Sequence, residues 1–327
     1  MKKICLVLLS LIFVIMVFVA CEKEDPSETE TVYYTVSFHS NGGTAVESVT
    51  VVAGGTILAP DEPTRENYIF TGWTLDGKSF VFDYTTVESD ITLNAEWKSA
   101  DDIFRYEPIA GSDSVRITSF TKEYKTMMLP NNINGFRVSA VGDGVFASLS
   151  SENVTRIIIP DTITEIGARA FAECSGIEFA VNGKLTYVGE KAFYACNGLK
   201  EVAFGEGLLR VGSEAFAGTS ITTVLLPQST AVVEENAFAY CRQLLTVLVY
   251  ADIADSAYAI EDGVFRDCTS LRTVFVYGNE DDGARILQKT ASGNECFEEA
   301  TFSYYAETDP EREGSYWYWH NGEPRIW

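Results

Sequence analysis

The sequence has very little of the chemistry that most enzymes and metal proteins use. Only two histidines, His39 and His320, occur in 327 residues, although histidine carries out most acid–base and metal-binding work near neutral pH. No Cys-x-x-Cys or histidine pair is present, and no Gly-x-Ser-x-Gly, Walker-type or paired-carboxylate pattern stands out. We therefore expect no enzymatic activity, no metal site and no cofactor.

Positive charge is also scarce. Lys and Arg total 24 against 47 for Asp and Glu, which gives a formal net charge of −23. A nucleic-acid backbone or an anionic headgroup requires a basic surface, so we expect neither as an electrostatic partner. Apolar residues nevertheless make up 46% of the chain. This is enough material for a folded core and argues against a disordered acidic chain.

The first residues have the layout of an export signal. Lys2 and Lys3 precede an apolar run from residue 4 to residue 20, and Cys21 follows. The site Phe18-Val19-Ala20-Cys21 resembles a lipoprotein signal site, with Phe18 where Leu is usual. The resemblance implies cleavage of residues 1–20, lipidation of Cys21 and anchoring to the bacterial membrane. An uncleaved membrane-spanning anchor is the alternative.

An acidic tether is expected from residue 21 to residue 32. The stretch behind Cys21 is acidic, contains Pro26 and has few large apolar groups, as a solvated spacer does. It also resembles the acidic export signal of surface lipoproteins in Bacteroidetes, with a plain spacer as the alternative. On the first reading, the protein is displayed at the cell surface and touches the membrane only through its lipid.

Residues 33–98 read as a small β module. Alternating and β-branched segments are separated by turn signals such as Asn41-Gly42-Gly43 and Asp76-Gly77. The module resembles the Listeria–Bacteroides repeat, also called the internalin B-type repeat. The signature residues are Val36, Phe38, Asn41, Gly42, Gly43, Pro63, Tyr68, Phe70, Gly72, Trp73, Asp90, Ile91, Thr92, Leu93, Ala95 and Trp97. The resemblance implies a β-grasp-like spacer or adhesive module.

An internal repeat fills most of the remaining chain. An Ile/Val-Gly-x-x-Ala/Val-Phe motif recurs every 22 to 27 residues, with Glu in place of Gly in the last two copies. The anchor phenylalanines are Phe146, Phe171, Phe193, Phe216, Phe238 and Phe265. Short strands lie between the motifs, and the copy over 177–188 fits only with a slip. The period predicts a leucine-rich-repeat solenoid, in which each turn, or rung, buries its apolar edge against its neighbours.

The repeat resembles the BspA-type leucine-rich repeats of bacterial surface proteins. It carries Ile159-Pro160 or Leu226-Pro227 after a strand and, in four copies, Cys three residues after the anchor Phe. We assign the solenoid to residues 99–305, with a first rung at 103–145. The resemblance implies adhesion and binding of extracellular or host surface proteins, without catalysis. The expected fold is thus mainly β with short helical or 3-10 turns.

Four cysteines occupy one repeat position. Cys174, Cys196, Cys241 and Cys268 follow their anchors at the same spacing. Their side chains should run parallel in adjacent rungs, which favours buried small apolar groups over disulfides. Cys296 has no explanation in the repeat.

The strands offer two outward columns as a candidate partner surface. Residues that flank the inward-facing strand positions should face solvent. One column includes Arg156 and Glu201, followed by threonines. The other is apolar and consists of Ile158, Ala203, Leu225, Leu248 and Phe275. An exposed apolar stripe suggests a protein-binding surface, whereas packing between neighbouring strands is the alternative.

The C-terminal residues 306–327 are rich in aromatics. A hairpin turning at Asn321-Gly322 could cover the open end of the solenoid. Alternatively, Trp317, Trp319 and Trp327 could stack on sugars, which would make the protein a glycan-binding surface lipoprotein. The sequence favours a non-catalytic surface protein that binds proteins through its repeat.

Overall fold

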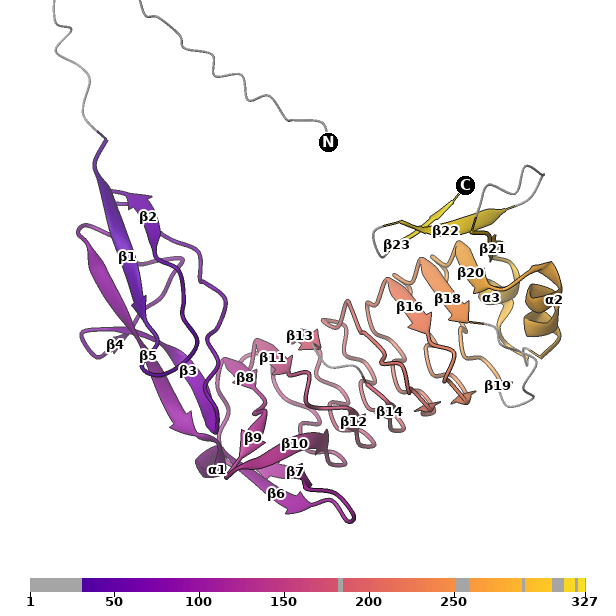
Figure 1. The fold of residues 1–327 in the computed structure, drawn as a ribbon, viewed down its shortest axis with the longest axis horizontal. Helices are drawn as coiled ribbons and strands as arrows, with labels where there is room; N and C mark the ends of the chain where they lie inside the picture. The colour runs from indigo at the N-terminus through magenta and orange to yellow at the C-terminus, as the bar shows by residue number, and fades with distance from the viewer. Residues whose placement is uncertain are drawn as a thin grey trace, which may run out of the picture.

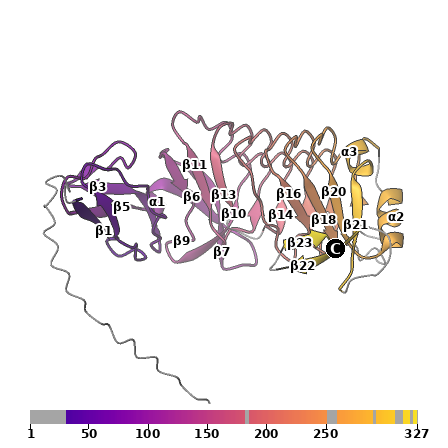
Figure 2. The same ribbon diagram turned by 90° about the horizontal axis from the view of Figure 1, so that it is seen from above.

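The computed structural model describes residues 31–181, 185–250, 259–289, 292–307, 315–320 and 323–326. The candidate signal, Cys21 and Trp327 lie outside these residues. A small sheet domain leads into a row of stacked rungs, and the chain ends beside the last of them (Figures 1 and 2). The predicted fold, a mainly β solenoid preceded by a β module, is confirmed. Among the described residues, no helix has the length and apolar character needed to cross a bilayer.

The module is one mixed sheet of strand order β2-β1-β5-β3-β4. Its strands are β1 (Tyr33–His39), β2 (Val49–Val52), β3 (Tyr68–Leu75), β4 (Lys78–Ser79) and β5 (Ile91–Ser99). The signature residues Phe70 and Trp73 lie in its core and meet edge-to-face with ring centroids 5.4 Å apart, and Phe38 and Trp97 pack against this core. This explains why these aromatics recur in the motif: they fill the interior of a sheet too small to bury many aliphatic side chains.

One long sheet runs beneath the rungs. It has nine strands in the order β19-β17-β15-β14-β12-β10-β7-β6, with β9 beside β10. These are β6 (Phe104–Pro108), β7 (Ser114–Phe120), β9 (Asn132–Ile133), β10 (Phe136–Val141), β12 (Glu165–Ile166), β14 (Tyr187–Val188), β15 (Arg210–Val211), β17 (Val232–Val233) and β19 (Ala259–Ile260). Most rungs contribute only the two residues before the Gly or Glu of the repeat motif.

Two upper sheets cover the opposite side of the rungs (Figure 1). The first contains β8 (Thr126–Met128), β11 (Arg156–Ile159) and β13 (Glu178–Val181). The second contains β16 (Thr223–Leu226), β18 (Thr246–Tyr250), β20 (Thr273–Tyr277), β21 (Thr301–Tyr305), β22 (Tyr316–His320) and β23 (Glu323–Ile326). They separate at the copy that fits the repeat with a slip, where the next rung makes only the bridge Leu185–Phe204.

The anchor phenylalanines stack along the solenoid axis. Their rings lie nearly parallel from Phe120 to Phe297, with centroids 4.9 to 5.8 Å apart. Phe297 belongs to α3 (Glu295–Glu298) and continues the stack beyond the six motif copies. Because each ring packs on the ring of the neighbouring rung, no rung can bury its core alone.

The repeat cysteines have a role beyond filling space. Each of the four is buried and free, and its thiol donates to the carbonyl oxygen of the anchor Phe one rung earlier. These bonds are Cys174 to Phe146 (3.0 Å), Cys196 to Phe171 (2.9 Å), Cys241 to Phe216 (3.2 Å) and Cys268 to Phe238 (3.1 Å). The expectation of buried, unpaired thiols is confirmed. The thiols add a donor from the next rung to carbonyl oxygens such as that of Phe171, which also accepts the Cys174 backbone N–H at 3.3 Å.

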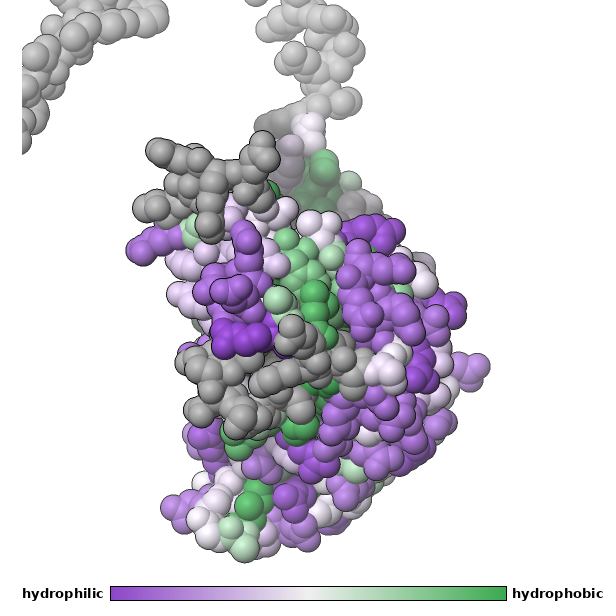
Figure 3. Space-filling view, turned by 90° about the vertical axis from the view of Figure 1, so that its right-hand side faces the viewer, coloured by the Kyte–Doolittle hydropathy of each residue, from purple (hydrophilic) through white to green (hydrophobic). Residues whose placement is uncertain are grey.

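Two helices lie near the ends of the solenoid. The short α1 (Ala100–Ile103) joins the module to the first rung, and its Ala100 and Ile103 are buried in the solenoid core. At the other end, α2 (Glu280–Lys289) lies beside the last rung with Ile286 in the core. Figure 3 looks onto this second end and shows apolar side chains between hydrophilic flanks.

Candidate functional site

The outward columns of the upper sheets have the predicted orientation. Leu225, Leu248 and Phe275 pair in register on β16, β18 and β20, while their neighbours Val224 and Leu226 point into the core. The outward residues form a separate apolar cluster on the other side of the sheet. Alternation along the strand therefore gave the correct faces.

The exposed apolar stripe is nevertheless wrong at its C-terminal end. Leu248 is 2% exposed and Phe275 7%, because the fully buried Trp317 of β22 lies over them. The indole N–H of Trp317 donates to the Val276 carbonyl oxygen at 3.0 Å. Trp317 is therefore part of a core, which also corrects its assignment as a sugar platform. The side chains of Trp319 and Trp327 are not among those described.

The predicted C-terminal hairpin is present, but it covers a different surface from the one expected. β22 pairs with β23 in an antiparallel hairpin, and β22 also continues the second upper sheet beside β21. Its Trp317 faces the outward side of that sheet, while α2 and α3 lie at the last rung (Figure 1). The hairpin thus closes an apolar face that the sequence alone leaves open.

The N-terminal members of the columns lie beside the module. Arg156 and Ile158 help to line a cavity of about 310 Å³, together with Asp61, Glu62 and Thr64 of the module. Glu201 and Ala203 are exposed and lie in the rung that joins neither upper sheet. The candidate residues are thus divided among the module junction, an open middle and a covered C-terminal part, and they do not form one continuous surface.

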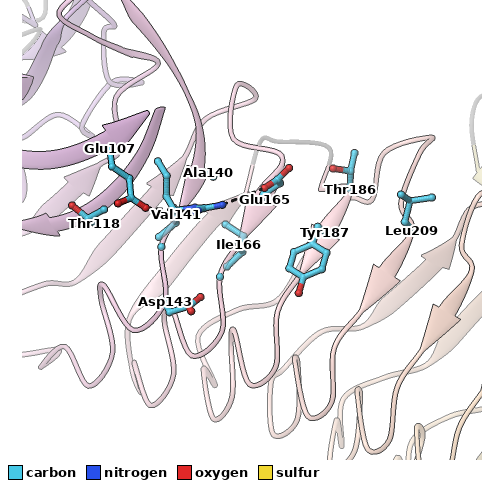
Figure 4. Close-up of a pocket in the computed structure, with 13 residues that line it drawn as sticks. Glu107, Thr118, Ala140, Val141, Asp143, Glu165, Ile166, Thr186, Tyr187 and Leu209 are labelled. Carbon is cyan, nitrogen blue, oxygen red and sulfur yellow. Dashed lines mark ion pairs between the residues drawn. The ribbon is translucent and has the colours of Figure 1, made fainter. Parts of the chain in front are cut away.

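A groove lies instead on the outward face of the long sheet. Figure 4 shows its lining, and the cavity measures about 620 Å³. Four of its lining residues, Arg116, Ala140, Glu165 and Tyr187, form one column that is paired from strand to strand in parallel register, and Arg210 continues this column beyond the groove. We call this surface the long-sheet groove; its other lining residues are Glu107, Thr118, Val141, Gly142, Asp143, Ile166, Gly167, Thr186 and Leu209.

Charged side chains form one wall of the long-sheet groove. Arg116 lies between two carboxylates, 3.6 Å from Glu107 and 3.9 Å from Glu165. It can reach Glu165 on β12 because Ala140, which stands between them on β10, is small and 1% exposed. All three charged side chains are partly exposed, so they remain able to pair with a partner's charges.

Two exposed side chains, Tyr187 and Leu209, form the C-terminal end of the groove (Figure 4). Leu209 is 60% exposed and Tyr187 38%. The Arg210 guanidinium lies 5.9 Å from the Tyr187 ring and also pairs with Glu234. An exposed Tyr and Leu beside arginines, with a charged rim, is the composition typical of protein-binding surfaces.

The sequence held a signal for this column that the motif search passed over. The residue immediately before each Ile/Val-Gly or Val-Glu pair of the repeat supplies one member, as Glu165, Tyr187 and Arg210 do. Alignment on the anchor Phe drew attention to the long intervening strands instead. Two-residue strands are too short to show alternation, so periodicity could not reveal them.

Metal-ligating side chains are not clustered in the described residues. No group of three or more His, Cys, Asp or Glu side chains in this part of the chain could hold a metal ion. Hydrogen bonding to a neighbouring thiol, followed by burial, raises the pKa of Cys196 and of Cys268. Hydrogen bonding lowers the pKa of their partner thiols Cys174 and, against the effect of burial, Cys241.

The stacked rungs with parallel ladders and a continuous Phe core define a leucine-rich-repeat solenoid. Residues 119–245 match the BspA type leucine rich repeat region in six copies, and residues 34–96 match the Listeria-Bacteroides repeat domain. The chain therefore combines BspA-type leucine-rich repeats with a Listeria–Bacteroides repeat, and both resemblances are confirmed.

Two relatives in Evansella cellulosilytica are named as membrane proteins. The first is 35% identical over 101 residues, which cover 28% of this chain and 15% of the relative. The second, named Gly-rich, is 41% identical over 68 residues, which cover 20% of this chain and 8% of the relative. The matching segments thus span only a small part of either relative.

Three solved structures are similar. The leucine-rich repeat protein of T. pallidum (TpLRR) has a TM-score of 0.43 and 22% identity and covers 57% of this chain and 92% of its own. A leucine-rich repeat protein of Bacteroides ovatus has a TM-score of 0.37 and 18% identity, and the match covers 63% of this chain and 72% of that protein. A leucine rich cell surface protein of Faecalibacterium prausnitzii has a TM-score of 0.33 and 20% identity, with 54% and 69% covered.

Proposed function

We propose that this is a non-catalytic surface lipoprotein that binds an extracellular or host surface protein through the long-sheet groove. The observation that carries the proposal is the exposed pair Tyr187 and Leu209 at the C-terminal end of a groove with a charged wall. Such side chains anchor protein interfaces when a partner removes them from water. The groove takes the place of the apolar stripe, whose C-terminal half is covered.

The charge pattern supports a protein partner over a small ligand. Arg116, Glu107 and Glu165 form a chain of partly exposed charges along one wall, and Arg210 and Glu234 extend it. Alternating charges of this kind fix the register of a partner surface rather than enclose a small molecule. The groove crosses several rungs, which suits an extended contact.

Anchoring completes the proposal. In this account, Cys21 carries the lipid, the acidic tether spans from the membrane, and the module holds the solenoid outward. Metabolic labelling with a fatty-acid analogue tests this step: the wild-type chain should be labelled, and Cys21→Ala should not. Labelling that persists in the variant would contradict lipidation at this residue.

A binding panel tests the site. The ectodomain from residue 22 is presented to immobilised extracellular-matrix and bacterial surface proteins and to a glycan array. We expect binding to at least one protein, and a loss of at least about tenfold in affinity for the double variant Tyr187→Ala/Leu209→Ser. Leu245→Ser is the control, because Leu245 is 50% exposed but lies outside the groove. Equal losses for both variants, or binding to glycans alone, would contradict the proposal.

A further inference from the structure

A second cavity lies where the module meets the solenoid. It measures about 1310 Å³ and is lined by β3, the segment 80–84 and the loop 59–62 on the module side. On the solenoid side, residues 123–126 and 152–156 line it. It is separate from the long-sheet groove, with which it shares no lining residue. We call it the junction cleft.

Two strand edges without a neighbouring strand border the junction cleft. β4 pairs only with Thr74 and Leu75 of β3, and Phe80 adds one hydrogen bond to the Trp73 carbonyl oxygen. Among the described residues, the edge of β3 from Phe70 to Gly72 therefore has no strand beside it. Across the cleft, β8 is the edge of the first upper sheet and pairs only with β11. β3 and β8 are in contact with each other. Edges of this kind can accept hydrogen bonds from an added strand.

The floor of the cleft leaves room for a second backbone. Gly72 has a φ of +139°, and a Cβ placed on it would meet no atom within 4 Å. It follows a bulge in the β3–β5 pairing, and its conformation excludes most other residues. A bare backbone position beside a free edge permits the close approach that strand pairing requires.

The charged side chains that line the junction cleft favour a positively charged ligand. Five acidic residues line the cleft against the two basic residues Lys125 and Arg156. The acidic residues are Asp61, Glu62, Asp83, Glu123 and Glu152. Within the described part of the chain, only Glu62 among them lies opposite an arginine, and none forms an ion pair at 4 Å or less. Lys125 is already used, because its ammonium donates to the Glu152 carbonyl.

The rim adds apolar contacts. Tyr84 is 85% exposed and Val81 51%, and both line the cleft. Such large exposed side chains beside unpaired carboxylates match a polypeptide that alternates apolar and basic residues. A chain with a net charge of −23 also attracts a basic partner from a distance and repels a second copy of itself.

We propose that the junction cleft binds an extended, basic polypeptide segment, which adds as a strand at the β3 edge. Its backbone pairs with Phe70–Gly72, its basic side chains meet the acidic walls, and its apolar side chains contact Val81 and Tyr84. The segment belongs to a partner protein. This site works independently of the long-sheet groove.

Designed peptides test the proposal directly on the wild-type ectodomain. The probe is a fluorescein-labelled peptide of alternating Lys and Val, followed by fluorescence polarisation at low salt. The first comparison peptide has Glu in place of Lys, and the second carries N-methyl groups on alternate backbone amides. We expect binding of the Lys peptide, at least about tenfold weaker binding of the Glu peptide, and loss of binding on N-methylation. Equal affinities for all three peptides would overturn the proposal, as would binding of neutral oligosaccharides alone.

Protein variants locate the site. Glu123→Lys and Tyr84→Ala should each lower the affinity for the Lys peptide at least about fivefold. Glu201→Lys and Tyr33→Ala are matched controls, since both residues are exposed and lie outside the cleft. The groove variant Tyr187→Ala should leave peptide affinity unchanged, so failure of this proposal is distinguishable from failure of the proposed function. Equal affinity in the cleft variants and the controls would place the peptide elsewhere and overturn the proposal.

Discussion

The indole ring of Trp317 rests on Phe275, with ring centroids 5.4 Å apart, on the outward face of the second upper sheet. Leu248 completes the contact. Most outward residues of a solenoid sheet face water, but here the C-terminal hairpin converts two rungs into a second small core. The contact decides which part of the repeat surface remains available to partners.

Trp317→Ala should uncover this face. Loss of a fully buried Trp costs about 3 to 5 kcal/mol, and it should appear as local opening of β22 and β23 because the cluster is separate from the main core. Hydrogen exchange would show faster exchange at residues 316–320 and 273–277, with unchanged exchange in the module. Protection equal to that of the wild type in this region would contradict the assignment.

The Phe stack predicts that position along the axis matters. Phe193→Ala removes a ring stacked on both sides, by Phe171 and Phe216, whereas Phe297 stacks only on Phe265. We expect Phe193→Ala to cost about 3 to 5 kcal/mol in urea unfolding and to affect rungs on both sides. Phe297→Ala should loosen only the C-terminal rung. Equal effects of both variants over the whole solenoid would argue against nearest-neighbour coupling.

The hydrogen bonds of the repeat cysteines predict a difference between two substitutions at Cys196. Cys196→Ala removes the thiol donor from the Phe171 carbonyl oxygen, which keeps its bond from the Cys174 N–H, and should cost about 0.5 to 1.5 kcal/mol. Cys196→Ser keeps a donor at the same place and should cost less. Thr219 shows that a hydroxyl fits this repeat position, where it donates to the anchor of its own rung, Phe216. Urea unfolding of the two variants measures the difference. If Cys196→Ser has the same free energy of unfolding as Cys196→Ala, the hydrogen bond does not stabilise the rung.

The environment of Glu62 at the junction predicts that folding stability depends on pH. Burial raises the pKa of this carboxyl, and its hydrogen bond to Thr126 and the charge of Arg156 only partly oppose the effect. A raised pKa in the folded state means that the protonated form favours folding, so this contribution is lost as pH rises through the folded-state pKa. Glu62→Gln should therefore raise the melting temperature at pH 7 and have less effect near pH 4. Glu201→Gln, at an exposed site, is the control. If Glu62→Gln raised the melting temperature more at pH 4 than at pH 7, the prediction would be contradicted.

The sequence predicted the solenoid well because its information is local and repeated. The anchors Phe171 and Phe193 lie in equivalent local motifs, and each copy specifies the same turn. Phe297 was not predicted as an anchor because its rung lacks the Gly-containing motif, although its ring continues the stack. Cys296, the residue without an explanation, simply precedes this last anchor and is half-buried.

The binding surfaces were harder to predict because they depend on contacts between distant segments. Trp317 and Leu248 are far apart in the sequence, so alternation along β18 could show which way Leu248 points but not what covers it. The junction cleft likewise requires the docking of β3 against β8. A repeat pattern specifies a scaffold, whereas docking between segments decides which of its faces stay open.

The most direct test of the central claim is a hydrogen-exchange footprint of the ectodomain bound to its protein partner from the binding panel. The account predicts protection at residues 164–167, 186–189 and 209–212, which contribute strands and lining residues of the long-sheet groove. Residues 223–226 of the opposite sheet should show no change. Protection confined to the upper sheets, with the groove unaffected, would contradict the account.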